Sequence, residues 1–158
     1  MERINQILKH PEFRRALEEI DRLEADRAFC RHGLDHLLSV ARLTLIYARE
    51  EGVDLSRELI YAAALLHDIG RGAQYADGTP HEEAAVDLAL PILADCGFML
   101  WEAAEIVEAI TAHRTGESAS DLGRLLYRAD KMSRPCFACS AVKECNWPEE
   151  QKNFSLEY

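Results

Sequence analysis

A histidine and an aspartate stand side by side at His67-Asp68, directly after an apolar run at residues 59–66. Neutral imidazole and ionised carboxylate are good ligands for a divalent metal ion, and chains avoid placing them beside an apolar core without a partner. The pair alone would also fit a core histidine next to a helix-terminal aspartate. Further groups of the same chemistry occur along the chain: His36, His81, His113 and Asp130. If these groups converge on folding, they form a metal centre.

Helices must position these groups, because apolar residues recur at spacings of three and four and no convincing strand alternation is present. The expected helices cover residues 3–8, 12–27, 34–51, 56–68, 81–95, 100–113 and 122–132. Thr79-Pro80-His81-Glu82 is typical of an N-cap, a proline at the first helical position and a capping-box glutamate, which places His81 in a first turn. Gly70 and Gly72 predict a loop after the His67-Asp68 pair. We expect an all-α, single-domain bundle of about six to seven helices.

Composition excludes several classes of function. The chain has 158 residues, of which 48% are hydrophobic, enough for one domain with a core and too few for two ordinary ones. Its net charge of −10 argues against nonspecific binding to nucleic acid or to an anionic membrane. No apolar stretch suits export or a membrane span, so we expect a cytoplasmic protein. An anionic ligand would need a local positive centre, which bound metal ions supply.

The order of these histidines and aspartates along the chain resembles that of a known family. His36, His67-Asp68 and Asp130, each in or at the end of an expected helix, together with the segments HLLSVA (residues 36–41) and ALLHDIG (residues 64–70), resemble the HD-domain superfamily of metal-dependent phosphohydrolases. The resemblance covers about residues 30–133. It implies a hydrolase domain over residues 1–134 and a cysteine-containing tail over residues 135–158.

Two more histidines refine the resemblance. His81 and His113 resemble the subgroup that binds two metals, and residues 109–116 are similar to bacterial hydrolases of symmetric dinucleoside tetraphosphates. The resemblance implies one ion on His36, His67, Asp68 and Asp130, and a second on Asp68, His81 and His113. Asp68 would then be the shared catalytic ligand, and iron or manganese suits the mixed ligand set. A one-metal site stays open as an alternative.

The implied reaction is cleavage of a phosphate ester or anhydride of a nucleotide, or of a similar small phosphorylated molecule, by a metal-bound hydroxide. Arg71, Arg114 and Lys131 each follow a candidate ligand closely and are candidate phosphate-binding groups. The relatives that cleave dinucleoside polyphosphates typically have lysine where this chain has Arg71, which leaves the substrate open. The alternative function is a regulatory HD module that binds a nucleotide or senses redox state. Nucleic-acid and membrane partners are not expected, and homo-oligomer formation is left open.

Three cysteines in the tail form a second candidate site. Cys136, Cys139 and Cys145 could hold zinc or an iron–sulfur cluster if Cys30 or Cys96 supplied a fourth ligand, and free thiols are the alternative. Of the remaining candidates, His32 is expected to cap or support rather than bind metal. Trp101 and Trp147 could stack on a nucleobase, although burial in the core is the more usual role of Trp101.

Overall fold

The most buried helix, α4 (Arg57–Leu66), is central in this computed structural model, which describes residues 1–158. Its N-terminus is capped by the Ser56 hydroxyl, which accepts a hydrogen bond from the Leu59 amide at 3.1 Å. Seven of its ten residues are buried, three of them consecutive alanines that let neighbouring helices approach closely. A helix buried on nearly all sides carries the residue that follows it, His67, into the interior.

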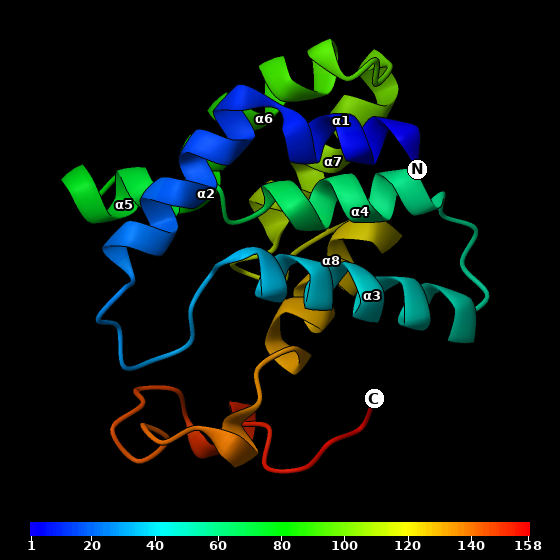
Figure 1. Ribbon diagram of the computed structural model, residues 1–158. Coiled ribbons are helices and arrows are strands. Elements are labelled where there is room, and N and C mark those ends of the chain that lie inside the picture. Colours follow the sequence, from blue (N-terminus) through cyan, green and yellow to red (C-terminus); the bar gives the residue numbers. More distant parts are fainter.

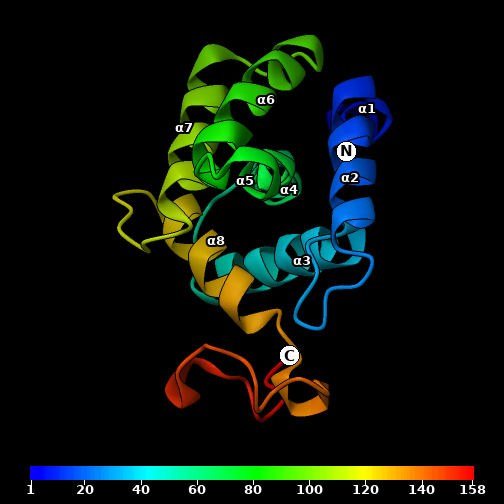
Figure 2. The same ribbon diagram turned by 90° about the vertical axis from the view of Figure 1, so that its left-hand side faces the viewer.

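Seven further helices complete the bundle (Figures 1 and 2). They are α1 (Glu2–Lys9), α2 (Pro11–Leu23), α3 (Leu34–Glu50), α5 (Arg71–Asp77), α6 (His81–Asp95), α7 (Leu100–Ala112) and α8 (Asp121–Met132). Four of them, α1, α3, α7 and α8, pack against α4. α3 packs along α4, α6 packs along α7, and α8 contacts α3, α4 and α7. The structure contains no strand, so the expectation of an all-α single domain is confirmed. None of the helices is long and apolar enough to span a bilayer.

One expected loop is a helix. Gly70 and Gly72 were expected to interrupt the chain, yet residues 71–77 form α5, and Gly78, at φ 85°, ends that helix instead. Gly70 has an ordinary φ of −80°, so it is not needed for a turn. A side chain there would meet the backbone of α6, because a Cβ atom on Gly70 would lie 2.1 Å from the His81 carbonyl oxygen. This glycine permits close approach between two segments.

Helix ends differ from expectation in two other places. α2 stops at Leu23, so residues 24–27 are not helical as expected. Thr79 does not cap α6; the N-cap is Pro80, and the Thr79 hydroxyl instead donates a hydrogen bond to Asp77 at 2.6 Å. In both places a side-chain contact lies at the boundary. Glu24 accepts a hydrogen bond from the His32 amide at 2.7 Å, and Asp77 holds Thr79.

The residues after α8 lie at one end of the bundle and are orange to red in Figures 1 and 2. Their only helical segments are two short 3-10 turns, η1 (Cys136–Ala138) and η2 (Glu149–Gln151). The main hydrophobic core contains 30 buried residues, the last of which is Ala129. The tail therefore packs against the bundle without contributing to that core.

Candidate metal centre

The first group of candidate ligands joins three helices. His36 lies in the first turn of α3, His67 and Asp68 directly follow α4, and Asp130 lies in the last turn of α8. One potential ligand atom from each of these four residues lies within 4.8 Å of all the others. The Nε2 atoms of His36 and His67 are 3.5 and 3.2 Å from Asp68 Oδ2, and His36 Nε2 is 3.2 Å from Asp130 Oδ1. The structure thus brings together all four residues of the first predicted ligand set.

A second group shares Asp68 with the first. His81 is the first residue of α6, and His113 directly follows α7. Their Nε2 atoms are 3.4 and 3.7 Å from Asp68 Oδ1, and 3.0 Å from each other. The two oxygens of one buried carboxylate therefore face different groups: Oδ2 faces His36 and His67, and Oδ1 faces His81 and His113. Such a carboxylate is suited to bridge two ions.

Backbone hydrogen bonds orient the imidazole rings. His67 Nδ1 donates to the Ala64 carbonyl at 2.7 Å, and His113 Nδ1 donates to the Ile110 carbonyl. With Nδ1 as the donor, Nε2 of a neutral ring presents a lone pair to the centre. His67 Nε2 and Asp68 Oδ2 are buried without any hydrogen-bond partner. Buried acceptors without donors are costly, so these atoms fit a site that a cation completes.

The pKa shifts of the buried ligand residues also indicate a place for a cation. Burial opposes ionisation of Asp68 and Asp130, but the close approach of the histidines stabilises the ionised forms and holds the pKa of both carboxyls well below the usual range. Although burial acts against it, the two carboxylates raise the pKa of His67 to about 9. The cluster thus requires positive charge at its centre, as a proton or as a metal ion in its place. By contrast, burial and Arg71 lower the pKa of His81 to about 3, which keeps this ring in the neutral form that binds metal.

A cavity of about 300 Å³ opens onto both groups. Its wall includes all three predicted phosphate-binding residues, Arg71, Arg114 and Lys131. Arg71 Nε donates to Asp68 Oδ1 at 2.9 Å, and Lys131 Nζ donates to Asp130 Oδ2 at 2.6 Å. Trp147 is also on the wall, with its ring 5.9 Å from Lys131 Nζ. The protein is acidic as a whole, but this cavity gathers cations around the candidate ligands.

Sequence reasoning missed two charged groups at this centre. Arg134 is 6% exposed; its Nη2 lies 2.9 Å from His36 Nε2 and 3.3 Å from Asp130 Oδ1. Its position four residues after Asp130 was the available signal. Glu82 places Oε2 3.3 Å from His81 Nδ1 and accepts a hydrogen bond from Arg114 at 2.9 Å. A carboxylate adjacent to a candidate ligand histidine in the sequence was the signal there.

Other candidates lie elsewhere or act indirectly. Trp101 is 62% exposed in the first turn of α7, about 18 Å along the helix from His113, so it is neither in the core nor at the cavity. His32 belongs to neither ligand group; its Nδ1 is bonded to buried Glu24 at 2.5 Å. Cys96 directly follows the C-terminal end of α6, whereas His81 is the first residue of that helix.

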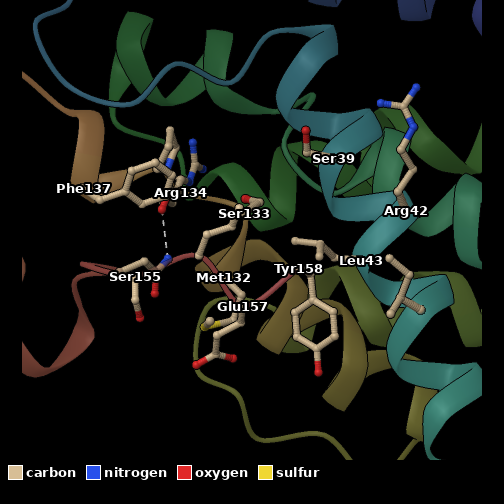
Figure 3. A pocket seen from close by; sticks show the side chains of 14 residues that line it. Ser39, Arg42, Leu43, Met132, Ser133, Arg134, Phe137, Ser155, Glu157 and Tyr158 are labelled. Carbon is tan, nitrogen blue, oxygen red and sulfur yellow. Dashed lines mark hydrogen bonds between the residues drawn. The ribbon is translucent and has the colours of Figure 1, made fainter.

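A different cavity, also about 300 Å³, lies between α3 and the end of the chain (Figure 3). Leu43 and Arg42 of α3 form one side, and Glu157 and Tyr158 form the other. None of the candidate metal ligands lines this cavity, so it is separate from the metal centre.

Comparison with known proteins gives a family and a fold. Residues 33–134 match the family model described as "HD domain". A crystal structure of a predicted HD superfamily hydrolase from an uncultured Thermotogales bacterium aligns with a TM-score of 0.58 and 28% identity, covering 94% of this chain and 86% of that one.

Sequence relatives fall into two kinds. An "Uncharacterized protein" of Clostridium beijerinckii is 40% identical over the full length of both chains. Ribonuclease Y 1 of Pediococcus pentosaceus is 31% identical over 110 residues, covering 70% of this chain and 19% of that protein. Ribonuclease Y of Acetivibrio thermocellus is 32% identical over 125 residues, covering 78% and 21% respectively. The chain therefore spans about a fifth of these ribonucleases.

Proposed function

Because the chain belongs to the HD-domain family, whose members are generally metal-dependent phosphohydrolases, we propose that it hydrolyses a phosphate ester or anhydride of a nucleotide or similar small molecule with two bound divalent ions. The main support for this proposal is the orientation of the Asp68 carboxylate, which directs one oxygen toward each of the two groups of histidines. When bound, such ions offset phosphate charge and lower the pKa of a coordinated water. Iron and manganese suit the mixture of imidazole and carboxylate donors.

The chain's own side chains would hold the substrate. Arg71 and Arg114 flank the second ligand group, and Lys131 flanks the first, so phosphate oxygens at the cavity mouth would meet cations on both sides. Phe29 and Trp147 line the same cavity and offer aromatic faces to a base. A volume of about 300 Å³ is at the small end of ligand sites and fits a single nucleotide better than a long polymer.

A second candidate substrate is a phosphodiester in RNA, which the similarity to ribonuclease Y favours. The same metal centre and the same cations would serve it. The net charge of −10 opposes association with a polyanion outside the cavity, so we place a small nucleotide first. An intact nucleotide that remains bound through purification would instead support the regulatory alternative.

The test is a hydrolysis screen joined to elemental analysis. Protein loaded with Mn²⁺ or Fe²⁺ is assayed against nucleoside mono-, di- and triphosphates, symmetric dinucleoside tetraphosphates and a single-stranded oligoribonucleotide. We expect close to two ions per chain and turnover of a nucleotide. Asp68→Ala should lose both ions and at least about 10²-fold in turnover, because it removes a shared ligand. The matched control is Asp54→Ala, on an exposed residue outside both groups. Metal-loaded protein that cleaves nothing in the panel refutes the proposal.

A further inference from the structure

The tail has little apolar packing to hold it in place. Its residues contribute nothing to the main hydrophobic core, and its only helical structure is two 3-10 turns. A few polar contacts tie it down: the Phe137 amide donates to the Asn153 carbonyl at 2.9 Å, and the Asn153 side chain donates to the Lys131 carbonyl at 2.8 Å. Chain segments that cannot bury enough apolar surface are usually fixed by a disulfide or a metal ion. Three of the five cysteines lie in this segment.

Cys30 shares cavity walls with each of the three tail cysteines. It lines the catalytic cavity together with Cys136 and Cys145, and it lines an adjoining cavity of about 440 Å³ together with Cys139. The Cys139 amide donates to the Cys136 carbonyl at 3.2 Å, so these two thiols belong to one tight turn. All five cysteines are free thiols. Cys96, at the far end of α6, borders neither cavity, which leaves Cys30 as the fourth member of the set.

Charged groups nearby suit a centre rich in thiolates. Burial is the main cause of a raised pKa for the Cys30 thiol; Arg134 acts to lower it, and the nearby tail cysteines act to raise it. Lys152 is 9% exposed, and its pKa is raised by Glu149 and further by Cys145 and Cys136. Arg134 and Lys152 would offset the excess negative charge of four thiolates around one divalent ion.

We infer that Cys30, Cys136, Cys139 and Cys145 bind one structural zinc ion that fastens the tail to the segment before α3. Four thiolates form a closed tetrahedral zinc site, with no position left for water. The groups of three or more donors that already lie within 4.8 Å of one another are the two histidine–aspartate groups, so the thiols must move closer around the ion. The thiol protons pass to solvent as the ion binds.

The ion would also position part of the catalytic cavity. Asn146 and Trp147 directly follow Cys145, and both line that cavity. Fixing Cys145 therefore fixes the aromatic wall that faces Lys131 and a bound substrate. This consequence rests on the proposed function, whereas the zinc site itself does not.

The experiment uses the full chain carrying Asp68→Ala, which removes the other ions and leaves the tail intact. Expression with zinc should give one zinc ion per chain. Replacement by Co²⁺ should give thiolate-to-metal charge transfer and the strong d–d bands of a tetrahedral centre. Adding Cys139→Ser or Cys30→Ser should remove the zinc and these bands, and adding Cys96→Ser should preserve both. Full zinc content in the Cys30→Ser protein, or no charge-transfer band, overturns the inference.

A measurement on the wild-type chain covers the case in which a serine variant fails to fold. Thiol titration should find four cysteines protected until a zinc chelator is added, with Cys96 reacting only on unfolding because it is 3% exposed. A disulfide among these cysteines in protein purified with zinc and reductant, a brown iron centre, or thiols whose reactivity is unchanged by chelator each contradicts zinc. If zinc is present but no substrate is cleaved, the inference stands and the proposed function fails.

Discussion

Replacing Gly70 with alanine tests how closely the segment after α4 must approach α6. The added Cβ would lie 2.1 Å from the His81 carbonyl oxygen and 2.5 Å from the Ala85 amide nitrogen. Cβ contacts below 3.0 Å are essentially never observed, so the start of α6 must retreat by at least about 0.9 Å. Both contacts are to backbone, and no side-chain rotation can relieve them. His81 would therefore move away from Asp68.

The size of the effect follows from this displacement. Overpacking of this kind costs about 1–3 kcal/mol, and each kcal/mol lowers Tm by about 2–4 °C in a domain of this size. His81 Nε2, now 3.4 Å from Asp68 Oδ1, would leave the second ligand group. The first group does not include α6 and should keep its ion. Misplacement by about 1 Å can lower turnover by about 10²-fold.

The assay combines elemental analysis, thermal unfolding and turnover on the Gly70→Ala protein. We expect about one ion per chain in place of two, a lower Tm and reduced turnover. Gly72→Ala is the matched control, since its Cβ would meet only the Glu19 carboxyl group, at 3.2 Å, on a flexible side chain. That variant should stay within about 0.5 kcal/mol of the wild type. Two ions and an unchanged Tm in Gly70→Ala would refute the reasoning, as would an equal loss in both variants.

Two further predictions concern stability. Arg3 Nη1 donates to buried Glu102 at 2.7 Å, so Arg3→Met should leave that carboxylate with the Met99 amide as a donor but without its charged partner. The free energy of unfolding in urea should fall by about 1–3 kcal/mol, and exposed Arg49→Met should have no comparable effect. Burial raises the pKa of Glu24, but hydrogen bonds from His32 outweigh it and lower the pKa from 4.5 to about 2. The charged form of Glu24 therefore stabilises the fold above pH 4.5, and this contribution is lost as pH falls toward 2. Wild type should exceed Glu24→Gln by about 3 kcal/mol near neutral pH and by little near pH 2, and a difference independent of pH would contradict this account.

The candidate ligands could be named from the sequence by their resemblance to the HD-domain pattern, and the structure places their donor atoms in two close groups. Burying His67 and Asp68 without a partner would be costly, so their place after the apolar run made them candidates, and only the further groups along the chain pointed to a metal site. The cap at Ser120 also follows a local rule, since its hydroxyl accepts from the Gly123 amide at 3.1 Å. Local chemistry of this kind is readable from neighbouring residues.

Features that depend on packing between distant segments could not be predicted from the sequence. Gly70 was expected to interrupt the chain as a loop residue, but its role is to let α6 approach, which no neighbouring residue reveals. Glu24 gained a partner in His32 only because α2 ends early and the chain turns back. Whether Cys30 or Cys96 lies beside the tail cysteines likewise depends on where the tail packs, and it is Cys30 that shares cavity walls with them. Contacts between distant segments determined each outcome.

The position of Arg134 has a consequence for how substrate and metal depend on each other. Its guanidinium rests against His36 and Asp130, where it satisfies two groups that an incoming ion would claim. An ion bound there would displace the guanidinium, which would stay tethered at the cavity wall by its hydrogen bond to the Arg31 carbonyl at 3.0 Å. One positive charge would then replace another in the interior, and the released guanidinium would be available to a phosphate. Filling the centre would thus prepare the anion site as well, so that affinity for substrate rises by more than the ion's own contacts provide.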